Sequence, residues 1–188
     1  MSSIQPSINQ IQKKLAISRL GLWLFFASDS FMFGGLLISR FYLLGNQKIE
    51  LNQFLGLVVT SVLLVSSFFM NRAEVMISRD NKKGFLTSLL ITILLGIVFL
   101  VGVVGLEWRD AHFGPADGAQ GAVFYMMTGM HAFHVLTGII FLLFVLRNGI
   151  NGKFNAENHF MVEASANYWH FVDVVWIIFY PALYLMGS

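Results

Sequence analysis

Long apolar runs separated by short polar segments dominate the pattern of hydrophobic and polar positions along the chain. A helix needs roughly 20 apolar residues to cross the hydrocarbon core of a bilayer. Five segments meet this requirement: residues 20–44, 51–70, 84–106, 122–146 and 162–186. The connections between them are too short to hold a soluble domain. The pattern therefore predicts an all-α integral membrane bundle of five transmembrane helices, with residues 20–188 forming one membrane domain.

Residues 1–19 precede the first apolar run and contain no apolar core of the kind that a cleavable signal peptide has. They place Ile4, Ile8, Ile11 and Leu15 at helical spacing, close to basic residues. This spacing is typical of an amphipathic helix that lies on an anionic membrane surface. A polar tail without such a helix is the alternative, and the sequence leaves both open.

The distribution of lysine and arginine predicts the direction of the chain through the membrane, because cytoplasmic loops carry an excess of these residues. The N-terminal segment and the loops at 71–83 and 147–161 lie on one side and hold nine of them: Lys13, Lys14, Arg19, Arg72, Arg79, Lys82, Lys83, Arg147 and Lys153. The other side holds three: Arg40, Lys48 and Arg109. The N-terminus is therefore expected to be cytoplasmic and the C-terminus to lie outside.

The composition supports a membrane protein and excludes several chemistries. Of the 188 residues, 56% are hydrophobic and only 12% are charged, whereas soluble domains carry about 25% charged residues. The chain contains no cysteine, which excludes disulfides, thiolate metal sites and cysteine nucleophiles. The basic residues are accounted for by membrane topology, so no nucleic-acid partner is expected.

Six aspartate, glutamate and histidine side chains fall inside the predicted spans, where a charge costs at least about 2.5 kcal/mol. They are Asp29 in the first span, His131 and His134 in the fourth, and Glu163, His170 and Asp173 in the fifth. Residues three apart share one helix face, and seven residues are close to two turns. The five residues of the last two spans are therefore expected to line facing surfaces and to form one buried polar network.

This cluster allows three interpretations. Histidines and a carboxylate could bind haem or another metal, polar residues could relay protons across the membrane, or they could form hydrogen bonds between helices. The Glu-x-x-His pairs of dinuclear carboxylate sites are absent, and the second and third spans contain no ionisable side chain. The pattern favours the hydrogen-bond network. For Asp29, a packing contact with another helix and a functional carboxyl group both remain open.

Small residues within the spans predict close approach between helices. Glycines occur in the first, third and fourth spans, and Ser66 and Ser67 lie in the second. The glycines are Gly34, Gly35, Gly96, Gly102, Gly105, Gly129 and Gly138.

Several sequence strings, taken together, resemble subunit III of the haem–copper respiratory oxidases. The most specific are YWHFVDVVWIIFYPALYL near the C-terminus, TGMHAFHVLTGIIFL before it and GIVFLVGVVGLEW in the third span. GLWLFFASDSFMFGGLLISRFYLLG resembles the entry helix of that family, and LLVSSFFMNRAEVMISRDNKKGFLTSLLIT resembles its next helix and loop. The resemblance covers residues 18–187 in order and spacing.

The resemblance implies an accessory subunit of a terminal oxidase. Such a subunit carries no haem or copper of its own and packs directly against subunit I, the catalytic chain that reduces dioxygen and pumps protons. Subunit II, and in some cases further subunits or a supercomplex, would complete the assembly. The family is thought to stabilise the catalytic subunit, bind structural phospholipids and support proton uptake. The five-helix form implies the bacterial plasma membrane as its location.

The resemblance also implies roles for individual residues. The buried carboxylate of the family falls at Asp29, its histidine pair at His131 and His134, and its glutamate at Glu163. The terminal motif includes His170 and Asp173, and Arg147 matches a basic residue placed to meet a lipid phosphate. Many members have glutamate where Asp29 stands, and long members have two further N-terminal helices.

Three other functions remain as alternatives. One is the subunit III-like protein associated with nitric oxide reductase. Another is a free-standing transporter, against which stand the absence of internal repeats and of broken helices. The third is a haem-bearing cytochrome that uses the histidines of the spans as ligands.

Overall fold

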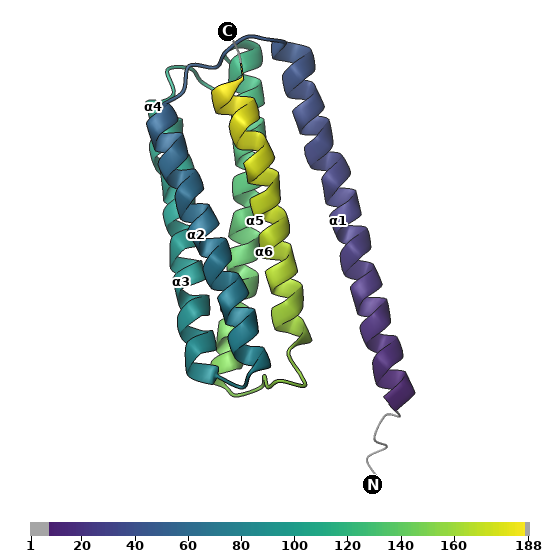
Figure 1. The fold of residues 1–188 in the computed structure, drawn as a ribbon. Helices are drawn as coiled ribbons and strands as arrows, with labels where there is room; N and C mark the ends of the chain where they lie inside the picture. Colours follow the sequence, from purple (N-terminus) through teal and green to yellow (C-terminus); the bar gives the residue numbers. More distant parts are fainter. Residues whose placement is uncertain (1–7, 187–188) are drawn as a thin grey trace.

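The computed structural model describes residues 8–186, and every regular element in this range is a helix. Figure 1 shows α1 (Ile8–Leu44), α2 (Gln53–Ser78), α3 (Lys82–Leu100), α5 (Gly118–Ile150) and α6 (Phe160–Tyr180). Two π-helices and a short turn extend them. η1 (Val101–Glu107) and α4 (Trp108–Asp110) follow α3, and η2 (Pro181–Leu185) follows α6.

Five helices are long and apolar enough to cross a membrane, which confirms the predicted all-α bundle. They span Leu15–Leu44, Gln53–Ser78, Lys82–Asp110, Gly118–Ile150 and Phe160–Leu185. Each helix extends beyond its apolar run into polar sequence. α1 begins at Ile8, within the N-terminal segment for which an amphipathic helix and a polar tail were both left open, and Ile4 lies outside the described residues.

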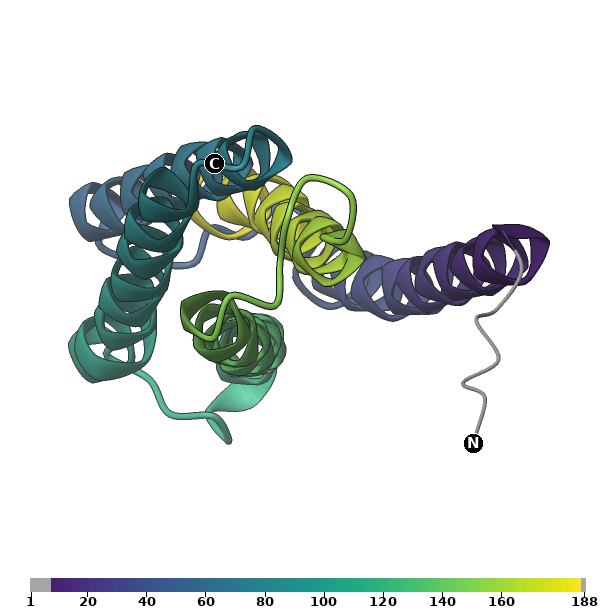
Figure 2. The ribbon, with the colours of Figure 1, turned by 90° about the horizontal axis from the view of Figure 1, so that it is seen from below.

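Four helices surround a common core, and α1 lies outside them. α2 packs on α3 and α6, while α5 packs on α3 and α6, so these four form a closed ring. α1 contacts α5 and α6, and its Ile8 end leans away from the other helices (Figure 2). We call the end of the bundle at which α1 and α6 begin the Glu163 end, and the opposite end, where α1 and η2 finish, the Arg40 end (Figure 1).

Asparagine caps define two of the helix starts. Asn52 accepts a hydrogen bond from the backbone N–H of Leu55 at 3.2 Å, and Asn81 accepts one from Gly84 at 2.9 Å. These bonds satisfy N–H groups that the first turn of a helix leaves free. Asp80 adopts a positive φ of 55° in the tight turn between α2 and α3. This conformation is one that aspartate tolerates better than most residues.

Two tryptophans fill the centre of the bundle, and glycines make room for one of them. Trp169 and Trp176 of α6 are almost completely buried. The indole of Trp169 lies between Gly96 of α3 and Gly138 of α5. A Cβ atom at Gly96 would approach Cη2 of Trp169 to 2.6 Å, and one at Gly138 would approach Cε3 to 3.0 Å.

The other expected small-residue contacts are only partly found. Gly102 lies against Val59, so α2 meets the start of η1 closely. Added Cβ atoms at Gly34 and Gly35 would meet no described atom within 4 Å, so these glycines of α1 do not approach another described helix. Their absence from the packing follows from the outer position of α1.

Substituting Gly96 with alanine is expected to destabilise the bundle. The new methyl group overlaps the Trp169 indole, and overpacking of this kind costs about 1–3 kcal/mol. Gly35→Ala is the matched control because its methyl group meets only open space. Thermal unfolding of the purified chain in mild detergent should show a lower melting temperature for Gly96→Ala alone. Equal melting temperatures for the two variants would contradict this packing.

Candidate functional site

The ionisable residues of the membrane-crossing helices lie in separate places rather than in one network. The three histidines point toward different neighbours. His131 meets the aromatic rings of α6 and α3, His134 faces Asp29 of α1, and His170 faces Ser67 of α2. Glu163 pairs with Arg19 instead of joining the histidines. The structure thus does not bring Glu163, His131, His134, His170 and Asp173 together, although all five occupy the two helices on which they were expected.

Hydroxyl groups of α2 pair with the polar atoms of α6 at three levels of the bundle. The indole N–H of Trp176 donates to Thr60 at 2.9 Å, and that of Trp169 donates to Ser66 at 3.0 Å. Ser67 lies 2.7 Å from Nδ1 of His170. Because α2 and α6 are antiparallel, Thr60 near the start of α2 meets Trp176 near the end of α6, and Ser66 and Ser67, further along α2, meet Trp169 and His170, which come earlier in α6. They fix the rotation and the register of α6 against α2.

His134 and Asp29 form the one close pair between the predicted carboxyl group of α1 and the histidines. Nε2 of His134 lies 3.4 Å from Oδ2 of Asp29, and both side chains are at least 85% buried. Nδ1 lies 2.8 Å from the carbonyl oxygen of Met130, which can only accept, so Nδ1 carries a proton. A hydrogen bond between Nε2 and Oδ2 then requires one further proton, on either group. Asp29 therefore contacts a polar group of another helix, and this contact is compatible with both roles left open for its carboxyl group.

His131 and Asp173 are buried, and neither makes a well-formed hydrogen bond among the described residues, although the Ser67 hydroxyl group that meets His170 is also the polar neighbour of Asp173. Both ring nitrogens of His131 and both carboxyl oxygens of Asp173 lack a hydrogen bond there. The ring of His131 lies 4.8 Å from that of Trp176 and 5.6 Å from that of Phe99, measured between centroids. Aromatic surroundings of this kind are unsuitable for a planar haem ligated at His131, because the rings occupy the space that the macrocycle would need.

Glu163 and Arg19 connect α1 to α6 at the Glu163 end. Nη2 of Arg19 lies 3.2 and 3.1 Å from the two carboxylate oxygens, and its guanidinium group stands 6.0 Å from the ring centroid of Phe160. The Arg19 side chain is 57% exposed. An ion pair this exposed contributes little stability, so it positions α1 more than it stabilises the bundle.

Arg40 is a buried cation that sequence reasoning placed in an outer loop. It is 0% exposed and donates four hydrogen bonds to backbone carbonyl oxygens: Ala182 at 2.7 Å, Gly45 at 2.7 Å, Met186 at 3.1 Å and Gln47 at 3.2 Å. Gly45 and Gln47 lie in the connection after α1, Ala182 lies in η2, and Met186 directly follows η2. The ends of helices carry partial negative charge that favours a cation. Within residues 8–186, Arg40 thus joins the first and last helices without a carboxylate partner, and only its place within an apolar run could have indicated this.

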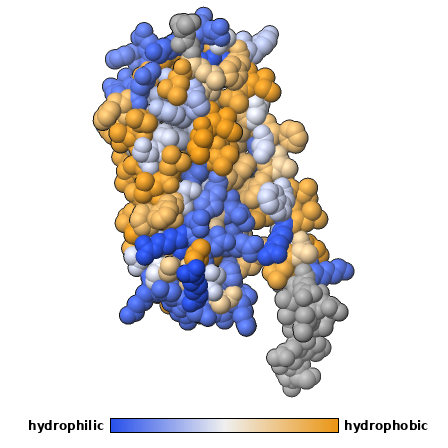
Figure 3. Space-filling view, viewed as in Figure 1, coloured by the Kyte–Doolittle hydropathy of each residue, from blue (hydrophilic) through white to orange (hydrophobic). Residues whose placement is uncertain are grey.

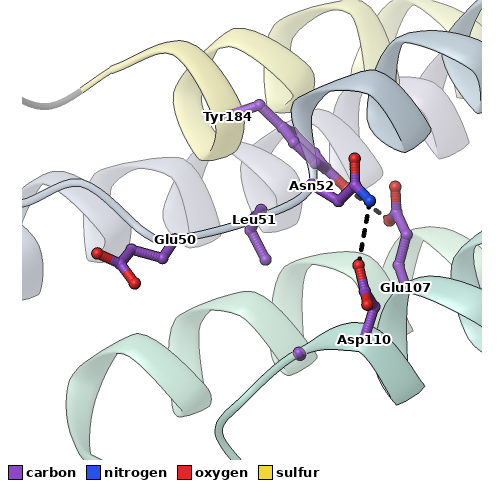
Figure 4. Close-up of a pocket in the computed structure, with 7 residues that line it drawn as sticks. Glu50, Leu51, Asn52, Glu107, Asp110 and Tyr184 are labelled. Atoms are coloured by element: carbon purple, nitrogen blue, oxygen red, sulfur yellow. Dashed lines mark hydrogen bonds between the residues drawn. The ribbon is translucent and has the colours of Figure 1, made fainter.

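A second polar cluster at the Arg40 end was also missed, because the apolar run was taken to end at Leu106. Glu107 is 4% exposed and accepts a hydrogen bond from the hydroxyl group of Tyr184 (Figure 4). Beside it, Asn52 donates to Asp110 at 3.2 Å (Figure 4). The ring of Tyr184 fits over Gly56, where a Cβ atom would approach its Cε1 to 2.5 Å. These contacts join the start of α2, the end of η1 and η2.

Arg147 is exposed in the last turn of α5, at the Glu163 end. The next residue, Asn148, lines a groove of about 510 Å³ between α1, α5 and α6. Phe25, Phe141, Phe144 and Tyr168 supply most of its apolar wall. Within residues 8–186, no three histidine, aspartate or glutamate side chains lie close enough together to hold a metal ion.

Comparison with known proteins identifies relatives of the chain. The family model for cytochrome c oxidase subunit III matches residues 8–188. A relative from Thermostichus vulcanus is 37% identical over 174 residues, which are 89% of this chain and 86% of the relative. One from Pongo abelii is 37% identical over 95% of this chain and 72% of the relative. One from Gadus morhua is 44% identical over 70% of this chain, and the match spans half of that relative's length. All three are described as cytochrome c oxidase subunit 3.

Replacing Arg40 with methionine is expected to lower the melting temperature of the chain in mild detergent. One buried and three half-buried carbonyl groups lose their donor, and a buried group left without a partner costs about 1–3 kcal/mol. A loss of about 2 kcal/mol corresponds to roughly 4–8 °C in a chain of this size. The melting temperature of Arg40→Lys should lie between those of the wild type and Arg40→Met, because lysine keeps the positive charge but has fewer hydrogen-bond donors than arginine.

Arg147→Met is the matched control for the Arg40 variants, because it removes the same charge from an exposed position. It should leave the melting temperature within about 1 °C of the wild type, as is usual for exposed substitutions. Equal melting temperatures for Arg40→Met and Arg147→Met would mean that the hydrogen bonds from Arg40 to the four carbonyl groups do not stabilise the fold.

Proposed function

Since the chain belongs to the cytochrome c oxidase subunit III family, we propose that it is the accessory membrane subunit of an aerobic haem–copper terminal oxidase. In this role it packs against the catalytic subunit I, stabilises it and supports its proton uptake, within an assembly that also contains subunit II. The observation that carries the proposal is the family match over residues 8–188 together with five membrane-crossing helices. The names of the relatives favour an oxidase over a nitric oxide reductase or a free-standing transporter.

We also propose that haem and copper belong to the partner subunits and that this chain holds no redox centre. The three histidines of its membrane-crossing helices contact different neighbours: His131 contacts aromatic rings, His134 contacts Asp29 and His170 contacts Ser67. A bis-histidine haem would need two of these rings to face each other across an open space. The buried polar residues act in this proposal as contacts between helices.

The proposed topology places the N-terminus in the cytoplasm and the C-terminus outside. Loops 79–81 and 151–159 and the start of α1 meet at the Glu163 end, which carries most of the lysine and arginine residues. The positive-inside rule assigns this end to the cytoplasm. Residues 1–19 then form the cytoplasmic segment of the chain and residues 20–188 the membrane domain. The cyanobacterial relative supports a location in a bacterial plasma membrane.

A structural phospholipid is proposed for the groove between α1, α5 and α6. Its aromatic and aliphatic wall suits an acyl chain, and Asn148 and Ser165 add polar atoms near the Glu163 end. Arg147, adjacent to Asn148 in the sequence and exposed, is the candidate to meet the lipid phosphate.

Purification of the tagged chain from its native membrane in mild detergent tests the proposed function. The expected result is a complex that contains larger membrane subunits and consumes dioxygen when an electron donor is supplied. A harsher detergent that removes this chain should leave oxygen consumption with the partners and not with the chain. Recovery of the chain alone, or with a nitric oxide reductase, would contradict the proposal.

A further inference from the structure

Polar residues form a stripe on the outward face of α6, inside the segment that is long and apolar enough to cross a membrane. Glu163, Asn167 and His170 follow one another at intervals of four and three residues and therefore share one face. Asn167 is exposed, and His170 is half-buried. Asn167 lies about 10 Å along α6 from Phe160, at 1.5 Å per residue. A carboxamide at this depth has no hydrogen-bonding partner in hydrocarbon.

α2 carries a matching stripe directly beside the first. Ser67, Asn71 and Glu74 have the same spacing, and Ser67 touches His170. Asn71 is exposed and Glu74 is half-buried. Figure 3 shows hydrophilic residues that rise from the Glu163 end toward mid-height on this face, with hydrophobic residues above them. The two stripes form one polar surface, which we call the Asn167 surface.

A groove runs along this surface between α6 and α1. It has a volume of about 420 Å³, and Asn167, His170 and Ser30 line it together with the rings of Trp23, Phe26 and Phe171. Closer to the Arg40 end it continues into a smaller, apolar groove of about 180 Å³ that Phe33, Leu37 and Ile178 help to line. Along α6, the groove between α1 and α6 thus changes from a lining with polar side chains near the Glu163 end to an apolar lining nearer the Arg40 end.

A groove on the other side of the molecule differs from this one, because its lining contains no polar side chain. There, α3, η1 and α5 enclose a groove of about 570 Å³ whose lining residues are all apolar or glycine: Leu100, Val101, Val104, Gly105, Ala132, Phe133 and Leu136. Lipid tails can cover such a surface without leaving any side-chain hydrogen-bonding group unpaired. The amide and imidazole groups of the Asn167 surface require hydrogen-bonding partners that lipid tails lack.

The charges of the Asn167 surface indicate what its partner carries. Glu74 has Glu163 and His159 among its charged neighbours, and Glu163 is already paired with Arg19. Glu74 and Glu163 thus add two neighbouring carboxylates to the Asn167 surface at the Glu163 end, and Arg19 pairs with one of them. A lysine or arginine of the partner would complete the pairing, and membrane helices commonly have such residues at their cytoplasmic ends.

We propose that the Asn167 surface is the seat for one transmembrane helix of another oxidase subunit. That helix carries a basic residue at its cytoplasmic end, hydrogen-bonding side chains over its cytoplasmic half and apolar side chains over its outer half. The inference rests on the proposed function, since it assumes an oxidase partner. Beyond the proposed function, it specifies the face of this chain that binds the partner helix and the end of that helix that lies beside Glu163.

Site-directed photocrosslinking tests the seat directly, because the chain contains no native cysteine. Single cysteines at Asn71 and Asn167 are labelled with a maleimide benzophenone in native membranes and irradiated. Matched control cysteines replace Phe133 and Leu136 in the apolar groove. We expect cross-links to another oxidase subunit from the first pair, in at least tenfold greater yield than from the controls. Cross-links to phospholipid alone from Asn71 and Asn167, or partner cross-links mainly from the controls, would overturn the proposal.

A bulky substitution gives a second test that does not depend on labelling. Asn167→Trp fills the groove and should reduce recovery of the partner subunits in mild detergent at least tenfold, while the isolated chain keeps its melting temperature. Phe133→Trp should recover the partners as the wild type does. Undiminished recovery with Asn167→Trp overturns the seat but leaves the proposed function intact. Failure of the wild-type chain to recover any oxidase subunit refutes both.

Discussion

Hydrocarbon accepts no hydrogen bonds, and this constraint determines how the polar residues of the chain are used. Any donor or acceptor inside the membrane needs a partner in the protein. α6 brings two indole groups and an imidazole into the bundle, and α2 supplies Thr60, Ser66 and Ser67 at the matching levels. The apolar surfaces of the helices would pack in many rotations. These three pairs select one rotation and one register, and the glycines around Trp169 allow the helices to close on it.

The same constraint explains the Arg40 end. A buried guanidinium group has five donors, and the free carbonyl groups at the ends of α1 and η2 have no further turn of helix to bond to. Arg40 satisfies four of these carbonyls at once. Since α1 lies outside the ring of the other four helices, this contact and the Arg19–Glu163 pair hold it at opposite ends. Its remaining surface stays available to lipid or to other chains.

The five spans could be predicted from the sequence because a run of about 20 apolar residues is itself the physical requirement for crossing a bilayer. The polar network could not, because helical spacing gives the face of a residue within its own helix but not the neighbour that the face meets. His131 and His134 illustrate this: three residues apart, they lie about 60° apart around α5, enough for one to meet α6 and the other α1. Arg40 and Glu107 were missed because their partners are backbone carbonyls and a tyrosine, distant in sequence and without opposite charge.

We expect that the paired polar groups hold helices together and that no histidine of the membrane-crossing helices, the unpaired His131 included, binds a redox cofactor. A reduced-minus-oxidised optical spectrum of the chain, before and after its partners are stripped away, tests this most directly. The complex should show the haem bands of an oxidase, and the stripped chain should be colourless. Haem absorbance that remains with the stripped chain would contradict the account, because His131, His134 or His170 would then be ligands.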